Sequence, residues 1–352
     1  MTVGFTPPIV DAGRTCAAGM VREWLQLATA KGAERLTLLE RSGIEAGALE
    51  DNENRIPLAS FVSLMRSAQE LCGEPALALH FGEVVDCTEY SVVSMMTRAC
   101  ATVADALEQR NRYERLVAEV EWEGPDRFRL EPFGGQVWLI DTRTEPNELP
   151  EFTESIFARI ATDLHRQGGS AFLHAVRFTH EARADRSEYD RIFQVPVTFG
   201  SDRNALLMDG SWPHQQIATL PTYAFGILSA HADALMKRLE NSKTTRGQVE
   251  SLLMPTLHTG EANVGEIARR LGVSRQTLFR RLRAEGVTFE RVLDELRHTL
   301  ALHYLGGKQV SVSETAYLLG FSEAAAFSRA FKRWTGTTPG AARASKRREA
   351  AG

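Results

Sequence analysis

Apolar residues between Val264 and Leu282 recur with the spacing of two short helices. From Val264 to Leu271 they fall at i, i+3, i+4 and i+7, which is typical of one apolar helix face. Gly272 can adopt the positive φ that ends a helix, and Ser274 is a favourable N-cap for the next one. Two short helices that meet at a glycine turn form the arrangement with which a helix-turn-helix enters the major groove of DNA.

The same pattern occurs a second time further along the chain. Residues 312–320 repeat the first helix and its glycine at an offset of 48 positions. Leu278 and Leu282 of the second helix recur as Phe327 and Phe331 at an offset of 49. An amphipathic helix expected between the two units would span roughly 24 Å. That length would place both units on one face of DNA, about one turn apart.

Upstream of these units, helical periodicity gives way at several places to an alternation of period two, which indicates an α+β domain. Ala118, Val120 and Trp122 predict a strand that forms a hairpin with residues 128–130. We expect the resulting sheet to be covered by helices on one face. Further strands are expected at residues 136–140, 175–179, 197–199 and 205–208, and helices at 20–30, 56–71, 75–82, 90–117, 151–166 and 186–193.

A polar stretch, residues 241–245, follows the helix expected over residues 223–239 and indicates a domain boundary. We therefore expect an N-terminal domain of residues 1–245 and an all-α domain of residues 246–352, since 352 residues exceed one ordinary domain. A narrow leucine stripe on the helix before the boundary could be a dimer seam or the seat of the helix on its own domain.

Charge is distributed unevenly between the two parts. From Glu261 onward there are 16 Lys and Arg against 9 Asp and Glu, a net charge of +7, whereas the preceding residues carry 25 against 36, a net charge of −11. Only the basic C-terminal part is therefore expected to face a polyanion such as nucleic acid. The chain has no apolar run of about 18 residues and no basic signal-peptide start. Its four cysteines lack C-x-x-C spacing, so we expect a cytoplasmic protein.

Signals of catalysis are absent from the sequence. None of G-x-S-x-G, G-x-x-x-x-G-K-[ST], G-x-G-x-x-G or H-E-x-x-H occurs, so we expect no enzyme, no cofactor and no metal. Tyr90, Trp138 and Phe152 could line a small-molecule pocket or simply belong to an apolar core. Glu151 and Glu154 lie near an expected helix start, and we interpret them as charges that favour the helix dipole there.

The most specific stretch is Gly320–Pro339, which contains G-F, then F-x-R-x-F-K-R, then G-x-T-P. With this signature, residues 261–339 resemble the paired helix-turn-helix DNA-binding domain of the AraC/XylS family of bacterial transcription regulators. Residues 56–61, 73–77 and 180–206 resemble the ligand-sensing domain of one branch of that family.

The resemblance implies several partners and one direction of control. It implies double-stranded promoter DNA, RNA polymerase, a small-molecule effector and a second copy of the chain as partners of a transcriptional activator. In this reading the N-terminal domain binds the effector and dimerises. The alternative is an effector-independent regulator whose N-terminal domain serves only dimerisation.

The second helix of each unit carries the residues expected to contact DNA. Arg pairs with guanine, Gln pairs with adenine, and an apolar ring can touch a thymine methyl group. The first recognition helix is expected to use Ser274, Arg275, Gln276, Thr277, Phe279, Arg280 and Arg281. The second is expected to use Glu323, Ser328, Arg329, Lys332 and Arg333. Alanines at its other outward positions favour phosphate anchoring over base reading. The alternative is that both sets form solvated helix faces, with Phe279 in the core.

Overall fold

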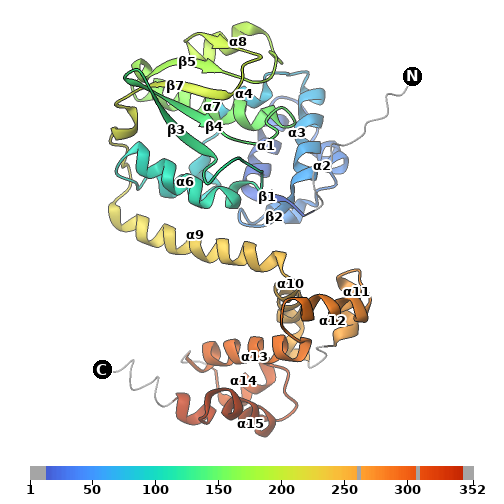
Figure 1. The fold of residues 1–352 in the computed structure, drawn as a ribbon. Helices are drawn as coiled ribbons and strands as arrows, with labels where there is room; N and C mark the ends of the chain where they lie inside the picture. Colours follow the sequence, from blue (N-terminus) through green and yellow to red (C-terminus); the bar gives the residue numbers. More distant parts are fainter. Residues whose placement is uncertain (1–12, 260–262, 307–309, 344–352) are drawn as a thin grey trace, which may run out of the picture. The chain divides into compact units, whose positions relative to one another are not determined.

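A computed structural model of the chain describes residues 13–259, 263–306 and 310–343. The chain divides into two compact units, Met1–Met236 and Lys237–Gly352. The first is an α+β unit and the second is helical in its described part, so the predicted fold class is confirmed (Figure 1). The division falls within helix α9 (Thr222–Lys243), upstream of the polar stretch at which the sequence analysis places the domain boundary.

In the described part of the first unit, five strands form one sheet in the order β3-β4-β7-β5-β6. They are β3 (Phe128–Phe133), β4 (Gln136–Asp141), β5 (Leu173–Arg177), β6 (Val197–Thr198) and β7 (Asn204–Asp209). Neighbouring strands are antiparallel except for β5 and β6. Val137 lies opposite Met208, and Leu139 lies opposite Leu206, so these four side chains share one face, which is buried in the main core.

The hairpin of this sheet joins β3 to β4 through Gly134 and Gly135, both of which have a positive φ. The strand expected at residues 118–122 is not part of the sheet, so the predicted hairpin is wrong. Ala118 instead forms an isolated bridge with Cys16 in a small sheet near the N-terminus. The strands of that small sheet, which the sequence analysis did not predict, are β1 (Thr15–Ala17) and β2 (Arg55–Pro57).

Helix α7 (Pro150–Arg166) covers the inner face of the large sheet, as expected (Figure 1). Its Phe157 is fully buried against the strands, a burial that contributes about 1.5–3 kcal/mol. Helix α4 (Leu77–Val84) packs very closely on α7. A Cβ atom on Gly82 would lie 2.2 Å from the carbonyl oxygen of Ser155, so only glycine fits at this crossing.

The other helices of the first unit follow the predicted pattern with three differences, the first of which is that α2 (Arg35–Ser42) was not expected from the sequence. They are α1 (Ala18–Ala30), α2 (Arg35–Ser42), α3 (Leu58–Cys72), α5 (Val92–Thr97), α6 (Val103–Val117) and α8 (Arg186–Phe193). Short 3₁₀ helices lie at Ala46–Leu49, Cys87–Glu89, Ser170–Phe172 and Trp212–His214. The helix expected over residues 90–117 is divided, because Thr102 and Asp105 form a capping box that begins α6. Ile56 and Pro57, expected in a helix, belong to β2 instead.

The second unit consists of helices wherever the structure describes it. They are α10 (Thr245–Leu253), a 3₁₀ helix (Met254–Thr259), α11 (Val264–Arg270), α12 (Arg275–Ala284), α13 (Phe289–Gly306), α14 (Val312–Leu318) and α15 (Ala324–Thr335). Helices α11 and α12 form one helix-turn-helix, and α14 and α15 form the other. Leu278, Leu282, Phe327 and Phe331 are fully buried in one core, so the repeated apolar positions are core positions. No helix in the described part of the chain is long and apolar enough to cross a membrane.

Candidate functional site

The first helix-turn-helix is positioned by caps and a glycine turn. The Asn263 side chain accepts a hydrogen bond from the Gly265 amide at 2.7 Å and begins α11. Gly272 has a φ of 66°, a conformation that disfavours any side chain. The Ser274 hydroxyl accepts from the Thr277 amide at 3.1 Å and caps α12. These contacts place the N-terminal half of α12 directly after the turn, where a recognition helix meets base edges.

The solvent-facing side of α12 carries basic charge without internal partners. Arg275, Arg280 and Arg281 are exposed, and none of them forms an ion pair or a side-chain hydrogen bond with another described residue. Gln276 is exposed as well, and Phe279 is 40% exposed, so the ring is not in the core. These donors can meet DNA without first breaking an ion pair within the protein.

The second helix-turn-helix has the same local geometry. Ser311 and Glu314 form a capping box at the start of α14, and Gly320 in the turn has a φ of 73°. Glu323 occupies the N-cap position of α15, but its side chain makes no capping hydrogen bond. Its carboxylate is therefore not engaged in the cap.

The outward residues of α15 differ from those of α12 in how they are paired. Arg329 and Lys332 are exposed and form no ion pair with another described residue, whereas Ser328 is partly buried. Arg333 donates to the Asp294 carboxylate of α13 at 2.7 Å. Among the described residues, the charged groups of Glu323, Arg329 and Lys332 thus form no ion pair, whereas Arg333 would have to leave one to reach DNA.

Arg297 joins α13 to the turn after α14, a role that was not predicted from the sequence. Its Nε donates to the carbonyl oxygen of Leu319 at 2.9 Å, and its guanidinium lies 4.7 Å from the centre of the Phe321 ring. Leu319 ends α14, where carbonyl groups lack helical partners, so the arginine satisfies one of them. The two residues are 22 positions apart, and no local pattern distinguishes this arginine from others on the helix.

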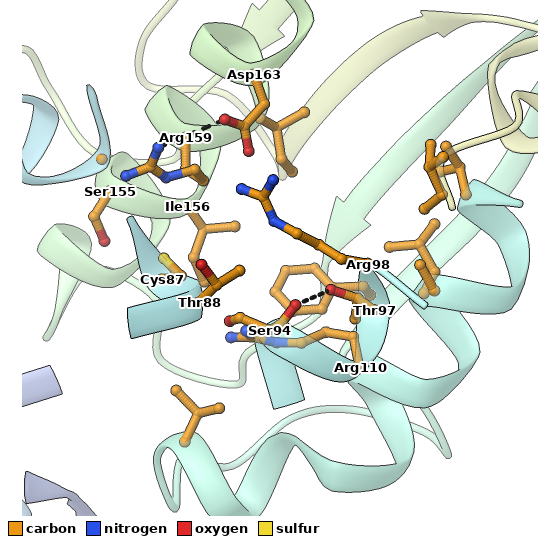
Figure 2. Close-up of a pocket in the computed structure, with 18 of the residues that line it drawn as sticks. Cys87, Thr88, Ser94, Thr97, Arg98, Arg110, Ser155, Ile156, Arg159 and Asp163 are labelled. Carbon is orange, nitrogen blue, oxygen red and sulfur yellow. Dashed lines mark hydrogen bonds and ion pairs between the residues drawn. The ribbon is translucent and has the colours of Figure 1, made fainter. Parts of the chain in front are cut away.

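The first unit contains a cavity of about 330 Å³, a size typical of a small-ligand pocket. Helices α6 and α7, strands β3 and β4 and residues 212–219 contribute to its walls. Figure 2 shows the polar part of this pocket, where Arg98, Arg159 and Asp163 lie close together. Much of the remaining lining is apolar, including Phe81, Val103, Leu107, Phe128, Leu139, Ile156, Ile160, Leu164, Trp212 and Ile217.

The three aromatic residues singled out in the sequence fall on different surfaces. Tyr90 and Phe152 line the cavity, whereas Trp138 does not. Trp138 lies on the outer face of the sheet, with the Arg177 guanidinium 4.6 Å from its ring centre. The alternation of β4 decides this, because Trp138 points away from the face that its neighbours Val137 and Leu139 share.

A fully buried ionic network lies beside the cavity. Arg127 donates to Asp141 at 3.1 Å and also to Glu114, and Arg143 donates to Asp141 at 3.1 Å. Although burial alone would raise it, the two guanidinium groups hold the pKa of Asp141 well below its usual range. Glu114 also accepts from Arg110 at 2.5 Å. Arg110 and Arg127, which both line the cavity, are therefore committed to this network.

Glu151 and Glu154 have a different role from the one inferred from sequence. Glu151 does lie in the first turn of α7, but both side chains are buried and paired. The Arg183 guanidinium contacts Glu151 at 2.6 Å, and the Tyr189 hydroxyl donates to Glu154 at 2.6 Å. Burial raises the pKa of Glu154 to about 7. The interpretation as favourable helix-start charges is thus incomplete, because distant residues cover these carboxyl groups.

Residues around the cavity also hold helix α9. The Arg98 carbonyl accepts a hydrogen bond from the Thr219 amide at 2.9 Å, just before α9 begins. Asp233 on α9 accepts from the Tyr113 hydroxyl of α6 at 2.6 Å. Thr219 and Ile217 themselves line the cavity. Hydrogen bonds therefore join the cavity walls to the segment just before α9 and join α6 to the middle of α9.

Two helix-turn-helix units in one helical domain, with a free basic face on α12, define a DNA-binding protein of the transcription-regulator class. Residues 32–217 match the family described as the arabinose-binding domain of AraC transcription regulator, N-term, and residues 267–345 match a helix-turn-helix domain family. The chain therefore belongs to the AraC family of transcription regulators. The family resemblance inferred from the sequence is confirmed.

Similar proteins match this chain along most of their length. The ornithine utilization regulator of Pseudomonas aeruginosa is 27% identical over 326 residues, which cover 90% of this chain and 92% of that protein. The regulator VirS of Mycobacterium tuberculosis is 26% identical over 330 residues, with 88% and 90% covered. The solved structure of the regulator CdpR from Pseudomonas aeruginosa has 22% identity and a TM-score of 0.39, with 88% and 96% covered. These relatives are transcription regulators rather than enzymes.

Proposed function

We propose that the protein is a sequence-specific regulator in which α12 reads bases in the major groove. The observation that carries this proposal is the free basic, amide-bearing face of α12. Arg275 and Arg280 can each donate two hydrogen bonds to guanine, Gln276 can pair with adenine, and the Phe279 ring can touch a thymine methyl group. Contacts to the flanking phosphates are assigned to Ser274, Thr277 and Arg281.

Helix α15 is proposed to anchor the duplex mainly through phosphates. Arg329 and Lys332 supply the free positive charge, and Ser328 can donate its hydroxyl. Arg333 contributes less, since its guanidinium is already paired with Asp294. Glu323 is the one outward group suited to a base, because its uncapped carboxylate can accept from a cytosine amine.

The test begins with genome-wide footprinting of the tagged protein to obtain its sites, followed by titration on one recovered site. Arg280→Ala should lose about 1–3 kcal/mol, roughly 5- to 150-fold in affinity, and relax specificity at one base position. Arg329→Ala should weaken binding to all sequences and reduce the salt slope by about 1. Arg269→Ala is the matched control, because this exposed arginine lies on α11 and is paired with Glu266 at 2.7 Å.

Either of two results would count against the DNA-reading proposal. One is weak binding at all sequences that Arg280→Ala leaves unchanged, which would make the paired units a non-specific anchor. The other is an equal loss in Arg280→Ala and Arg269→Ala, which would show that positive charge anywhere on the unit is sufficient.

The regulatory half of the proposal is that a small molecule in the cavity controls DNA binding and transcription. It is supported by the match of residues 32–217 to an arabinose-binding domain and by the hydrogen bonds that join the cavity walls to α9. A ligand that binds the protein more tightly when α9 has one arrangement raises the population of that arrangement. The arrangement of the DNA-binding domains that accompanies it then becomes more populated as well. We propose a cytoplasmic homodimer that activates transcription by contact with RNA polymerase.

The alternative is a regulator whose N-terminal domain only dimerises. Thermal-shift and reporter experiments on the full chain distinguish this alternative from effector control. An effector should raise the melting temperature and change promoter output, and sedimentation velocity should show a dimer. A dimer that gives the same promoter output and melting temperature across a broad chemical screen would favour the alternative.

A further inference from the structure

The charged groups of the cavity are not equivalent in how they are satisfied. Arg110 and Arg127 are held by Glu114 within the buried network. Arg98 and Arg159 instead have one long ion pair each, to Asp86 and Asp163 respectively, both at 3.5 Å. Two of the four arginines that line the cavity thus keep donors for something else.

Arg159 is the more buried of these two arginines. Its side chain is only 15% exposed, and its Nε and Nη2 atoms are buried without a hydrogen-bond partner in the described part of the chain. An unsatisfied buried donor costs about 1–3 kcal/mol, and more when the group is charged. A ligand acceptor in the cavity would remove that cost, which makes Arg159 a site for an anion rather than a structural arginine.

Arg98 approaches the same end of the cavity from the opposite wall. Figure 2 shows its guanidinium extending towards Asp163 and Arg159. The backbone of Arg98 is fixed, because its carbonyl accepts from the amides of Thr219 and Leu220 at 2.9 and 3.2 Å. The main chain of Arg98 is therefore fixed at this end of the cavity, while most donors of its guanidinium remain available.

The acidic residues nearby do not offset these arginines fully. Asp86 already accepts from the Thr88 amide at 2.9 Å and from the Thr88 hydroxyl at 2.7 Å. Asp163 is the partner of Arg159. Over the whole lining, four arginines face three carboxylates, Asp86, Glu114 and Asp163, so one positive charge is in excess. Much of the remaining lining is apolar, and a low-dielectric wall strengthens a charge-assisted hydrogen bond.

We propose that this cavity takes an amphipathic organic anion, whose acid group is held between Arg98 and Arg159 and whose apolar body lies against α6, α7 and β4. Arginine is suited to this role because its planar fork binds a carboxylate through two parallel hydrogen bonds. The inference rests on the proposed function, since it names the chemical class of the effector. It also places that effector directly on the residue whose backbone holds the start of α9.

The test compares isosteric probes on the purified full-length protein. Octanoate and phenylacetate are titrated against octanamide, phenylacetamide and octylamine. The readouts are the melting temperature and the tryptophan fluorescence, to which the cavity residue Trp212 contributes. At least one acid should bind at least tenfold more tightly than its amide and than the amine. Arg98→Met and Arg159→Met should each weaken that acid at least tenfold. Arg129→Met, an exposed arginine on the outer face of the sheet, should not.

Several outcomes would overturn the inference. Equal affinity for an acid and its amide would do so, as would failure of both acids to bind. Tighter binding of octylamine than of the acids would show that Asp163, rather than the two arginines, recognises the ligand. Circular dichroism checks that each variant is folded. If Arg159→Met does not fold, Arg98→Met still tests the inference. Acid binding that leaves DNA occupancy unchanged would support the inference and refute effector control. Control of DNA occupancy by a neutral or cationic compound would refute the inference and support effector control.

Discussion

The buried Glu154 carboxyl should make the stability of the first unit depend on pH. Its side chain is 1% exposed, and burial raises its pKa from 4.5 to about 7. The folded protein therefore binds this proton more tightly than the unfolded chain does. The resulting stability is fully present below about pH 4.5 and is lost as the pH rises to about 7. The difference between the two pKa values corresponds to roughly 3 kcal/mol of unfolding free energy.

Glu154→Gln removes this titration while keeping the shape of the side chain and an acceptor for Tyr189. The unfolding free energy of the variant relative to wild type should therefore rise by roughly 3 kcal/mol between pH 4.5 and 7.5. Urea unfolding followed by tryptophan fluorescence measures it, because four of the five tryptophans lie in the first unit. Glu148→Gln, an exposed carboxyl beside the start of α7, controls for the loss of one negative charge.

One neighbouring group titrates in the opposite direction. His180 lies 3.7 Å from the Glu154 carboxyl, and burial lowers its pKa. Its stability contribution is therefore lost as the pH falls, but His180 is present in both proteins, so the comparison removes most of it. Parallel stability profiles for wild type and Glu154→Gln between pH 4.5 and 7.5 would refute the reasoning, since they would show that Glu154 ionises at its ordinary pKa.

Two further substitutions, one in each unit, test contacts within that unit. Gly82→Ala should destabilise the first unit by at least about 1–3 kcal/mol in urea unfolding, because its Cβ would lie 2.2 Å from a backbone oxygen of α7. Gly226→Ala on α9, with nothing within 4 Å, should instead be neutral or gain about 0.5–1 kcal/mol. Arg297→Ala should cost the second unit about 1–3 kcal/mol by thermal or urea unfolding, since it leaves a carbonyl at the end of α14 unpaired. Arg291→Ala, which breaks only an exposed pair with Glu295, should cost less than about 1 kcal/mol, and equal losses would contradict the assigned role of Arg297.

The helix-turn-helix pair could be predicted from sequence because its determinants are local. Helix periodicity places Leu278 and Phe331 in the core, and a glycine with positive φ defines each turn, followed in the first helix-turn-helix by the Ser274 cap. Exposed basic residues on α12 follow from the same periodicity. The repeat at 48 and 49 residues then shows that the pattern is not accidental.

The first unit was predicted less completely because its determinants are distant in sequence. Residues 118–122 alternate in sequence, but they form no strand of the large sheet. Ala118 bridges Cys16 of β1, about a hundred residues earlier, and Trp122 bridges Arg143, just after β4. Whether Trp138 lies in the cavity or on the outer face depends on the strand register, because a shift of one residue would turn every side chain of the strand to the opposite face.

By itself, the sequence determined the fold class, the family and the two DNA-binding units with their outward residues, since helix period, caps and glycine turns act over a few residues. Only the tertiary structure decided which charged groups are buried and which are free. Arg98 and Arg159 meet across a cavity from segments about sixty residues apart, and Glu154 is covered by Tyr189 from another helix. Burial and pairing depend on what packs against a side chain, and no local pattern of residue types encodes that.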